Sequence, residues 1–188
     1  MGRRKKAEQK PKRKKVTTKP LEREHSGKVT EPYRLMEDLI DKHHSHLKDA
    51  KMAICWRFGW NQDADGRLSL GRAKKASDLD RALKEYDFAI LLNWEAWNKG
   101  GLDQAQKAAV IDHELCHCQV VVDRNGETKT DEEGRTVYRV RKHDVEEFKD
   151  VVSRHGLYTS ELASLAEAGI KDSKRPLLTE LEKTSAAK

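Results

Sequence analysis

The sequence has no long hydrophobic run and few cysteines, and both absences narrow the class of protein. Of its 188 residues, 36% are hydrophobic and 37% are charged, and no segment approaches the about 18 apolar residues of a membrane-spanning helix. No apolar segment follows the basic start, as one would in a secretory signal peptide. The three cysteines are an odd number without the spacing of a disulfide framework. We therefore expect a cytoplasmic protein in a reducing compartment, with no membrane partner.

Acidic and aromatic residues are scarce near the N-terminus. Residues 1–28 hold 12 Lys/Arg against 3 Asp/Glu, a net charge of +9, whereas the whole chain carries +6. A segment with so few apolar residues cannot bury enough surface to fold alone, so we expect a disordered basic tail over residues 1–28. Such a tail either solubilises the chain or binds nucleic acid by counterion release, without aromatic residues for base stacking. The candidate nucleic-acid-binding residues are Arg3, Arg4, Lys5, Lys6, Lys12, Arg13, Lys14 and Lys15.

Residues 113–117 form the pattern H-E-x-x-H on a predicted helix. Positions four apart lie one above the other on a helix, so His113 and His117 can bind the same metal ion. Two neutral imidazoles suit Zn²⁺, and a third protein ligand would leave one tetrahedral position open for water. Glu114 would lie beside the ion, where it could take the proton of that water and later protonate a leaving amine. The pattern predicts a zinc metallopeptidase; the alternative is a helix with two structural histidines.

The flanking sequence predicts a helix in the right phase for this site. Asp103 and Gln106 have the spacing of a capping box, directly after a break at Gly100 and Gly101. The following residues contain no Gly or Pro, and the histidines lie off their apolar stripe. That stripe is formed by Ala108, Ile111, Leu115 and Cys118. One helix face is therefore expected to pack, and another to hold a metal.

Other segments predict a domain of mixed helices and strands. We expect a helix over residues 30–50, a half-buried strand over 51–60, a buried strand over 88–92 and a short helix around Trp94 and Trp97. Residues 71–86 are polar and leave room for a short helix capped at Ser77 or Asp78. Two β-rich runs between residues 120 and 140 predict an exposed ribbon. Further helices are expected from His143 to His155 and over residues 160–168.

A hydrolytic zinc site needs a third ligand, and the candidates follow about 26 residues after His117. His143 is the first choice, because it completes a set of three imidazoles where the second helix is expected to begin. Asp144 is an alternative, either as a ligand or as an acceptor for the N–H of a bound imidazole. It also makes an Asp-x-x-Glu capping box with Glu147. The weaker candidates are Glu147, Glu146 and His155.

The remaining histidines and cysteines are not expected to bind a metal. His43, His44 and His46 do not converge on one helix face, so we expect partly buried or solvated side chains. Cys116 and Cys118 point about 200° apart on one helix and are not expected to share an ion. We expect packed free thiols at both positions.

Three segments resemble the putative phage metallopeptidase domain family, a zincin-like group distantly similar to SprT-like proteases. They are residues 86–93 (YDFAILLN), 112–118 (DHELCHC) and 143–148 (HDVEEF). The resemblance implies a zincin-like α+β fold with a small, mainly antiparallel sheet packed on the active-site helix, a zinc ion, and Glu114 as general base and acid. It also implies a phage or prophage product in a bacterial cytoplasm. The longer metzincin pattern, H-E-x-x-H-x-x-G-x-x-H, is absent, because Val120 stands at the position of its glycine.

Two functions are carried forward from the sequence. The first is a zinc-dependent metallopeptidase formed by residues 29–170, with a loosely ordered tail over residues 171–188. Its peptide or protein substrate could pair with a sheet edge, at the strand around Ile54 or Ile90. The second is a nucleic-acid-binding phage accessory protein with a structural zinc site and a basic tail. We favour the peptidase, because a structural site would be expected to close its fourth position with a convergent thiolate.

Overall fold

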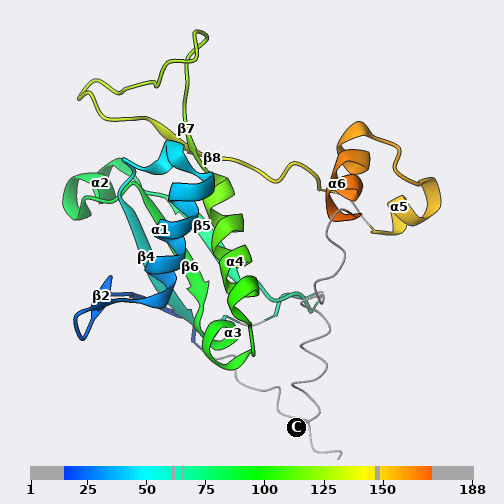
Figure 1. Cartoon of the computed structure of the whole chain (residues 1–188), viewed down its shortest axis with the longest axis horizontal. Helices are drawn as coiled ribbons and strands as arrows, with labels where there is room; N and C mark the ends of the chain where they lie inside the picture. Colours follow the sequence, from blue (N-terminus) through cyan, green and yellow to red (C-terminus); the bar gives the residue numbers. More distant parts are fainter. Residues whose placement is uncertain (1–14, 61, 65, 147–148, 171–188) are drawn as a thin grey trace, which may run out of the picture.

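A four-stranded mixed sheet is the centre of the computed structural model, which describes residues 15–60, 62–64, 66–146 and 149–170 (Figure 1). Across the sheet the strands follow the order β1 (Thr17–Pro20), β4 (Met52–Phe58), β6 (Phe88–Asn93) and β5 (Gly71–Lys75). The pair β4 and β6 is parallel, and the two outer pairs are antiparallel. β4 and β6 are therefore the central strands, and β1 and β5 are the edges.

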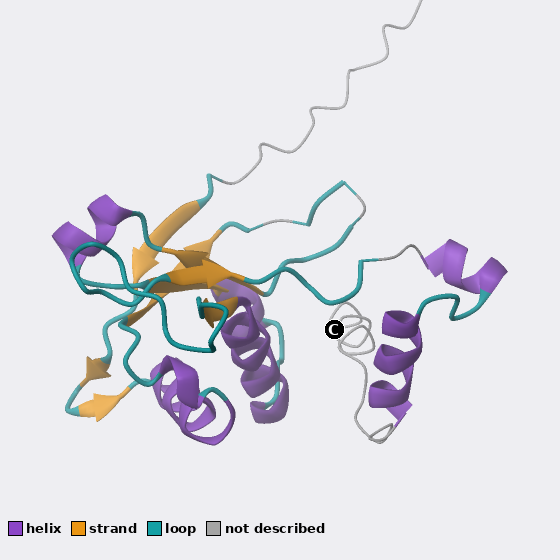
Figure 2. Ribbon diagram, turned by 90° about the horizontal axis from the view of Figure 1, so that it is seen from above, coloured by secondary structure: helices purple, strands orange, loops and turns teal. Residues whose placement is uncertain are grey.

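Two helices cover one face of this sheet, α1 (Glu31–His43) and α4 (Gln104–His117) (Figure 2). Between the helices and the sheet lies the hydrophobic core, in which alternate residues of β4 and β6 meet the apolar stripe of α4. The side chains of this contact include Ile54, Phe88, Ile90, Leu92, Ile111 and Leu115, all at most 1% exposed. The mixed helices and sheet agree with the expected α+β class.

The other elements are shorter. They are β2 (Glu24–His25), β3 (Lys28–Val29), η1 (Ser45–Leu47), α2 (Asp78–Lys84), α3 (Trp94–Lys99), β7 (Cys118–Val120), β8 (Tyr138–Val140), α5 (Lys149–His155) and α6 (Ser160–Ile170). Figure 1 draws α5 and α6 apart from the sheet and its two covering helices. No helix among the described residues is both long and apolar enough to cross a bilayer.

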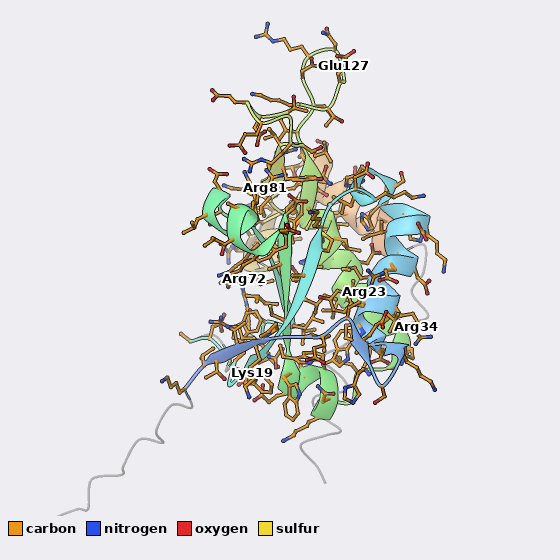
Figure 3. All side chains as sticks on the ribbon, turned by 90° about the vertical axis from the view of Figure 1, so that its left-hand side faces the viewer. Lys19, Arg23, Arg34, Arg72, Arg81 and Glu127 are labelled. Atoms are coloured by element: carbon orange, nitrogen blue, oxygen red, sulfur yellow. The ribbon has the colours of Figure 1, made fainter. Side chains whose placement is uncertain are left out.

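The connection between β7 and β8 is an exposed excursion of the chain, residues 121–137. It contains two turns of the same design, in which Asp123 and Asp131 accept backbone N–H bonds from residues two and four positions later. Figure 3 shows Glu127 at its tip, away from the sheet. Arg81 of α2 holds the base of the excursion, since its guanidinium donates to the Thr136 carbonyl and pairs with Asp87. The excursion therefore leaves and rejoins the domain at fixed points.

Several elements predicted from the sequence are confirmed. α4 begins with the predicted capping box: the Asp103 carboxylate accepts from the Gln106 N–H at 2.8 Å, and the Gln106 side chain accepts from the Asp103 N–H at 2.9 Å. The half-buried strand is β4, the buried strand is β6, and the short tryptophan helix is α3. Ser77 is the N-cap of α2.

Other predictions are wrong. Residues 17–20, expected to belong to a disordered tail, form β1. All four are exposed and are held by backbone pairing with β4, so the strand needs no apolar residues and the composition gives no sign of it. The strands around Ile54 and Ile90 are central and cannot receive a substrate at an edge. The helix expected from His143 begins at Lys149. The expected tails over residues 1–14 and 171–188 lie outside the described residues.

Candidate metal centre

A cleft of about 700 Å³ lies between the edge strand β5, the helix α4 and the chain that leaves β8. β5 and the residues before it supply one wall, and residues 140–146 supply the other. Leu70, Ala109, Val110 and Val140 give the cleft an apolar lining. All three histidines of the predicted zinc site border this cleft, together with Glu114.

The side chains of His113, His117 and His143 converge. The Nε2 atom of His113 lies 3.3 Å from that of His117 and 3.1 Å from that of His143. One ring nitrogen from each of the three lies within 4.8 Å of the other two. Three imidazole nitrogens at these separations fit a single cation between them, because neutral lone pairs directed at one another are otherwise repulsive.

Pairing of β7 with β8 brings the distant His143 to the helix. Val140 lies opposite Cys118, and the ladder continues to the next pair, where the Arg141 N–H donates to the His117 carbonyl at 2.8 Å. His143 follows two residues later. Although 26 residues separate His143 from His117 in the sequence, the antiparallel pairing of β7 and β8 brings the two residues close together.

The same pairing fixes the tautomer of His117. Its Nδ1 lies 2.6 Å from the Arg141 carbonyl oxygen, which can only accept a hydrogen bond. The proton must therefore be on Nδ1, and Nε2, the atom facing the other two histidines, keeps its lone pair. Burial lowers the pKa of His113 below its ordinary value, and the charges of His117 and His143 add to this effect. A neutral His113 is the form that binds a metal.

Glu114 is held beneath the edge strand β5. Its side chain is buried, with 4% of the residue exposed, and its Oε2 accepts the Ala73 N–H at 2.6 Å. Burial raises the pKa of Glu114 above its ordinary value, while the Ala73 N–H acts in the opposite direction. The carboxyl group thus lies at the border of the cleft in an environment that favours proton uptake.

Gly71 provides the space that Glu114 needs. A Cβ atom at position 71 would lie 2.5 Å from Glu114 Oε1 and 2.9 Å from its Cδ and Cγ. Such separations are far below van der Waals contact, so only glycine fits here while Glu114 keeps its position.

The other predicted site residues do not join the group of three imidazoles. Asp144, the alternative third ligand, is exposed and pairs with Arg141. Glu146 borders the cleft, with its Oε1 3.8 Å from Nδ1 of His143. His155 is exposed in α5. Glu147 and the tail residues from Arg3 to Lys14 lie outside the described residues, and Lys15 is exposed.

Sequence reasoning missed three groups at this site: Gly71, the Ala73 N–H and the Arg141 carbonyl. Two of them are backbone groups, which every residue type carries, so no side-chain pattern reveals them. Gly71 carries a usable signal, because a single glycine at the start of a short alternating segment is typical of a close backbone approach.

Three converging imidazoles beside a buried carboxylate define a candidate metal centre whose donor set suits zinc. The family model described as "Putative phage metallopeptidase" matches residues 25–169, and the chain belongs to this family. The resemblance inferred from three short segments is thereby confirmed. No curated protein and no solved structure matches the chain. Membership of a metallopeptidase family implies a metal ion and a peptide substrate.

Proposed function

We propose that this protein is a zinc-dependent peptidase whose metal is held by His113, His117 and His143. The observation that carries the proposal is the convergence of the three imidazole nitrogens at a cleft that Glu114 also borders. Three neutral imidazoles leave room for a further ligand in tetrahedral coordination, as a hydrolytic site requires. The ion would supply Lewis acidity, which polarises a peptide carbonyl and makes water acidic near neutral pH.

Glu114 is proposed as the general base and then the general acid. Its raised pKa is suited to this role, because a carboxyl group that titrates closer to neutral pH both accepts and returns a proton readily. The N–H of Ala73 orients the carboxyl group, and Gly71 allows the close approach. The fixed tautomer of His117 keeps its Nε2 free for the metal.

An extended substrate could pair with the outer edge of β5. The Asn93 N–H donates to the Leu70 carbonyl and the Ala76 N–H donates to the Asp87 carbonyl, so even-numbered residues of this segment bond to the β6 side. The backbone groups of Gly71 and Ala73 therefore point away from β6. Both residues border the cleft. Because Glu114 already accepts the Ala73 N–H, a peptide strand could add to the backbone groups of Gly71 and to the Ala73 carbonyl.

Cleavage of internally quenched peptides, measured together with bound zinc, tests the proposal. Glu114→Gln is expected to retain zinc and to lose at least about 100-fold in kcat/KM, because the proton acceptor is gone. His113→Ala is expected to lose both zinc and cleavage. Glu132→Gln, on the exposed excursion, is the matched control and should match the wild type. Unchanged cleavage by Glu114→Gln would refute the mechanism.

A basic and aromatic cluster favours a second candidate function, nucleic-acid binding. The guanidinium carbons of Arg57 and Arg72 lie 5.4 and 5.7 Å from the ring centre of Trp60. Figure 3 shows Arg72 on the side of the sheet away from α1. Arg57 also bonds to Thr18 of β1, the strand that follows the basic N-terminal residues. An aromatic ring beside two cations can stack on a base while the cations bind phosphate.

Salt-dependent binding distinguishes this second function. The test variant replaces four basic residues by glutamine in the full chain: Arg3, Arg4, Lys5 and Lys6. The residues of β1 itself are unchanged. We expect weaker binding to single-stranded DNA and a shallower dependence of log K on log salt, by about 0.7 per lost phosphate contact. If the wild-type chain shows no binding at low salt, this candidate is excluded, and the peptidase proposal is unaffected.

A further inference from the structure

A second cluster of side chains of the types that bind metals lies outside the cleft, between the end of α1 and the C-terminal half of α4. It consists of His44, Asp112 and Cys116, each offering one ligand atom, and these atoms all lie within 4.8 Å of one another. His44 Nε2 lies 2.6 Å from Asp112 Oδ1. The three side chains bring one nitrogen, one oxygen and one sulfur donor to the same point.

The sequence builds this cluster by the same spacing that builds the cleft site. Asp112 and Cys116 are four residues apart on α4, so they lie one above the other, as His113 and His117 do. Each precedes one of those histidines by one residue, which places the second pair about 100° around the helix. His44, the C-cap residue directly after α1, approaches α4 from the neighbouring helix.

We propose that His44, Asp112 and Cys116 form a second metal site, suited to zinc or a similar transition-metal ion. A mixture of imidazole, carboxylate and thiolate favours such ions over calcium and magnesium, which take oxygen ligands. Zinc lies about 2.0–2.3 Å from its ligand atoms, so it needs them about 3.3–3.8 Å apart. Small side-chain rotations therefore convert the present contacts into coordination.

Burial and exposure within the cluster suit metal entry from solvent. His44 is 6% exposed and hence fixed in place, whereas Asp112 is partly exposed and Cys116 is exposed. An ion could therefore reach the three donors and keep a further coordination position for water. Bound there, it would cross-link the end of α1 to the turn of α4 that carries both cleft histidines.

The sulfur donor allows this site to be observed separately from the cleft. Cadmium bound to a thiolate gives an ultraviolet sulfur-to-metal absorption band, which three imidazoles cannot produce. Titrating the full chain with Cd²⁺ is expected to develop this band to the intensity of one thiolate-bound ion per chain, whereas Cd²⁺ taken up by the cleft histidines adds nothing to it. Cys116→Ser should abolish it, and Cys55→Ser, which changes a thiol on β4, should leave it intact.

Two further variants separate a metal site from a single reactive thiol. His44→Gln and Asp112→Asn should each weaken Cd²⁺ binding by at least 10-fold, whereas His43→Gln, at the exposed neighbouring position, should not change it. Circular dichroism of each variant checks the fold. An absent band, a band that survives Cys116→Ser, or equal affinity in His44→Gln would overturn the proposal. None of these results bears on zinc or cleavage in the cleft, since its three proposed ligands are unchanged.

Discussion

Replacing Gly71 by alanine tests how closely β5 approaches Glu114. The new Cβ would lie 2.5 Å from Glu114 Oε1, so the carboxyl group must move away from the Ala73 N–H. Overpacking costs about 1–3 kcal/mol, losing the hydrogen bond to a charged group about 1.5–3, and the stiffer unfolded chain offsets about 0.5. We therefore expect the free energy of unfolding to fall by about 2–5.5 kcal/mol.

A double-mutant cycle in urea isolates this contact. Glu114→Ala removes all three atoms that the new Cβ would meet, so Gly71→Ala should cost little in that background. Gly169→Ala is the matched control: no atom lies within 4 Å of its added Cβ, and helix propensity favours alanine by up to about 1 kcal/mol. In the peptidase assay Gly71→Ala should reduce kcat and leave bound zinc unchanged. An equal loss of stability with and without Glu114 would refute the reasoning.

Three further predictions concern stability measured by denaturation of the metal-free chain. Because the pKa of Glu114 is raised in the fold, the folded state holds its proton more tightly than the unfolded chain does, so stability should decline as pH rises above 4.5. Glu114→Gln should flatten that decline, and an unchanged pH profile in this variant would contradict the prediction. Tyr33→Phe removes the buried acceptor of the Ile54 N–H and should cost about 1–3 kcal/mol in urea, a loss absent if water replaces the hydroxyl. Asp103→Ala removes the cap of α4 and should lower the unfolding free energy by about 1 kcal/mol, whereas Asp123→Ala, on the excursion, should leave α4 unaffected.

The sequence predicts best the elements whose signals are local. Asp103 and Gln106 mark the start of α4 by their own side chains, and an unbroken apolar run marks β6. The edge strands escape prediction for a physical reason. β5 reads Gly-Arg-Ala-Lys-Lys because one of its sides faces solvent, and such a composition is equally typical of a loop.

The sequence does not predict the contacts between distant segments on which the candidate site depends. The residue type of His143 predicts a third ligand, but the helix expected to carry it begins only at Lys149. His44 was expected to be solvated or partly buried, and it instead meets Asp112, 68 residues later. Cys116, expected to be packed, is exposed, while Cys118 is buried as expected. Periodicity assigns a side chain to a face of its helix, but only the fold determines what lies opposite.

Because of the register between β7 and β8, the geometry of the cleft does not depend on the length of the excursion. Since Val140 is matched to Cys118, the position of His143 is counted from this strand pair and is independent of how many residues the chain spends in between. Loop insertions in homologous chains could thus accumulate at residues 121–137 without cost to the third imidazole. A slip of one step between the strands would displace it by about 3.3 Å. The length of the excursion and the position of the third imidazole are therefore set independently of each other.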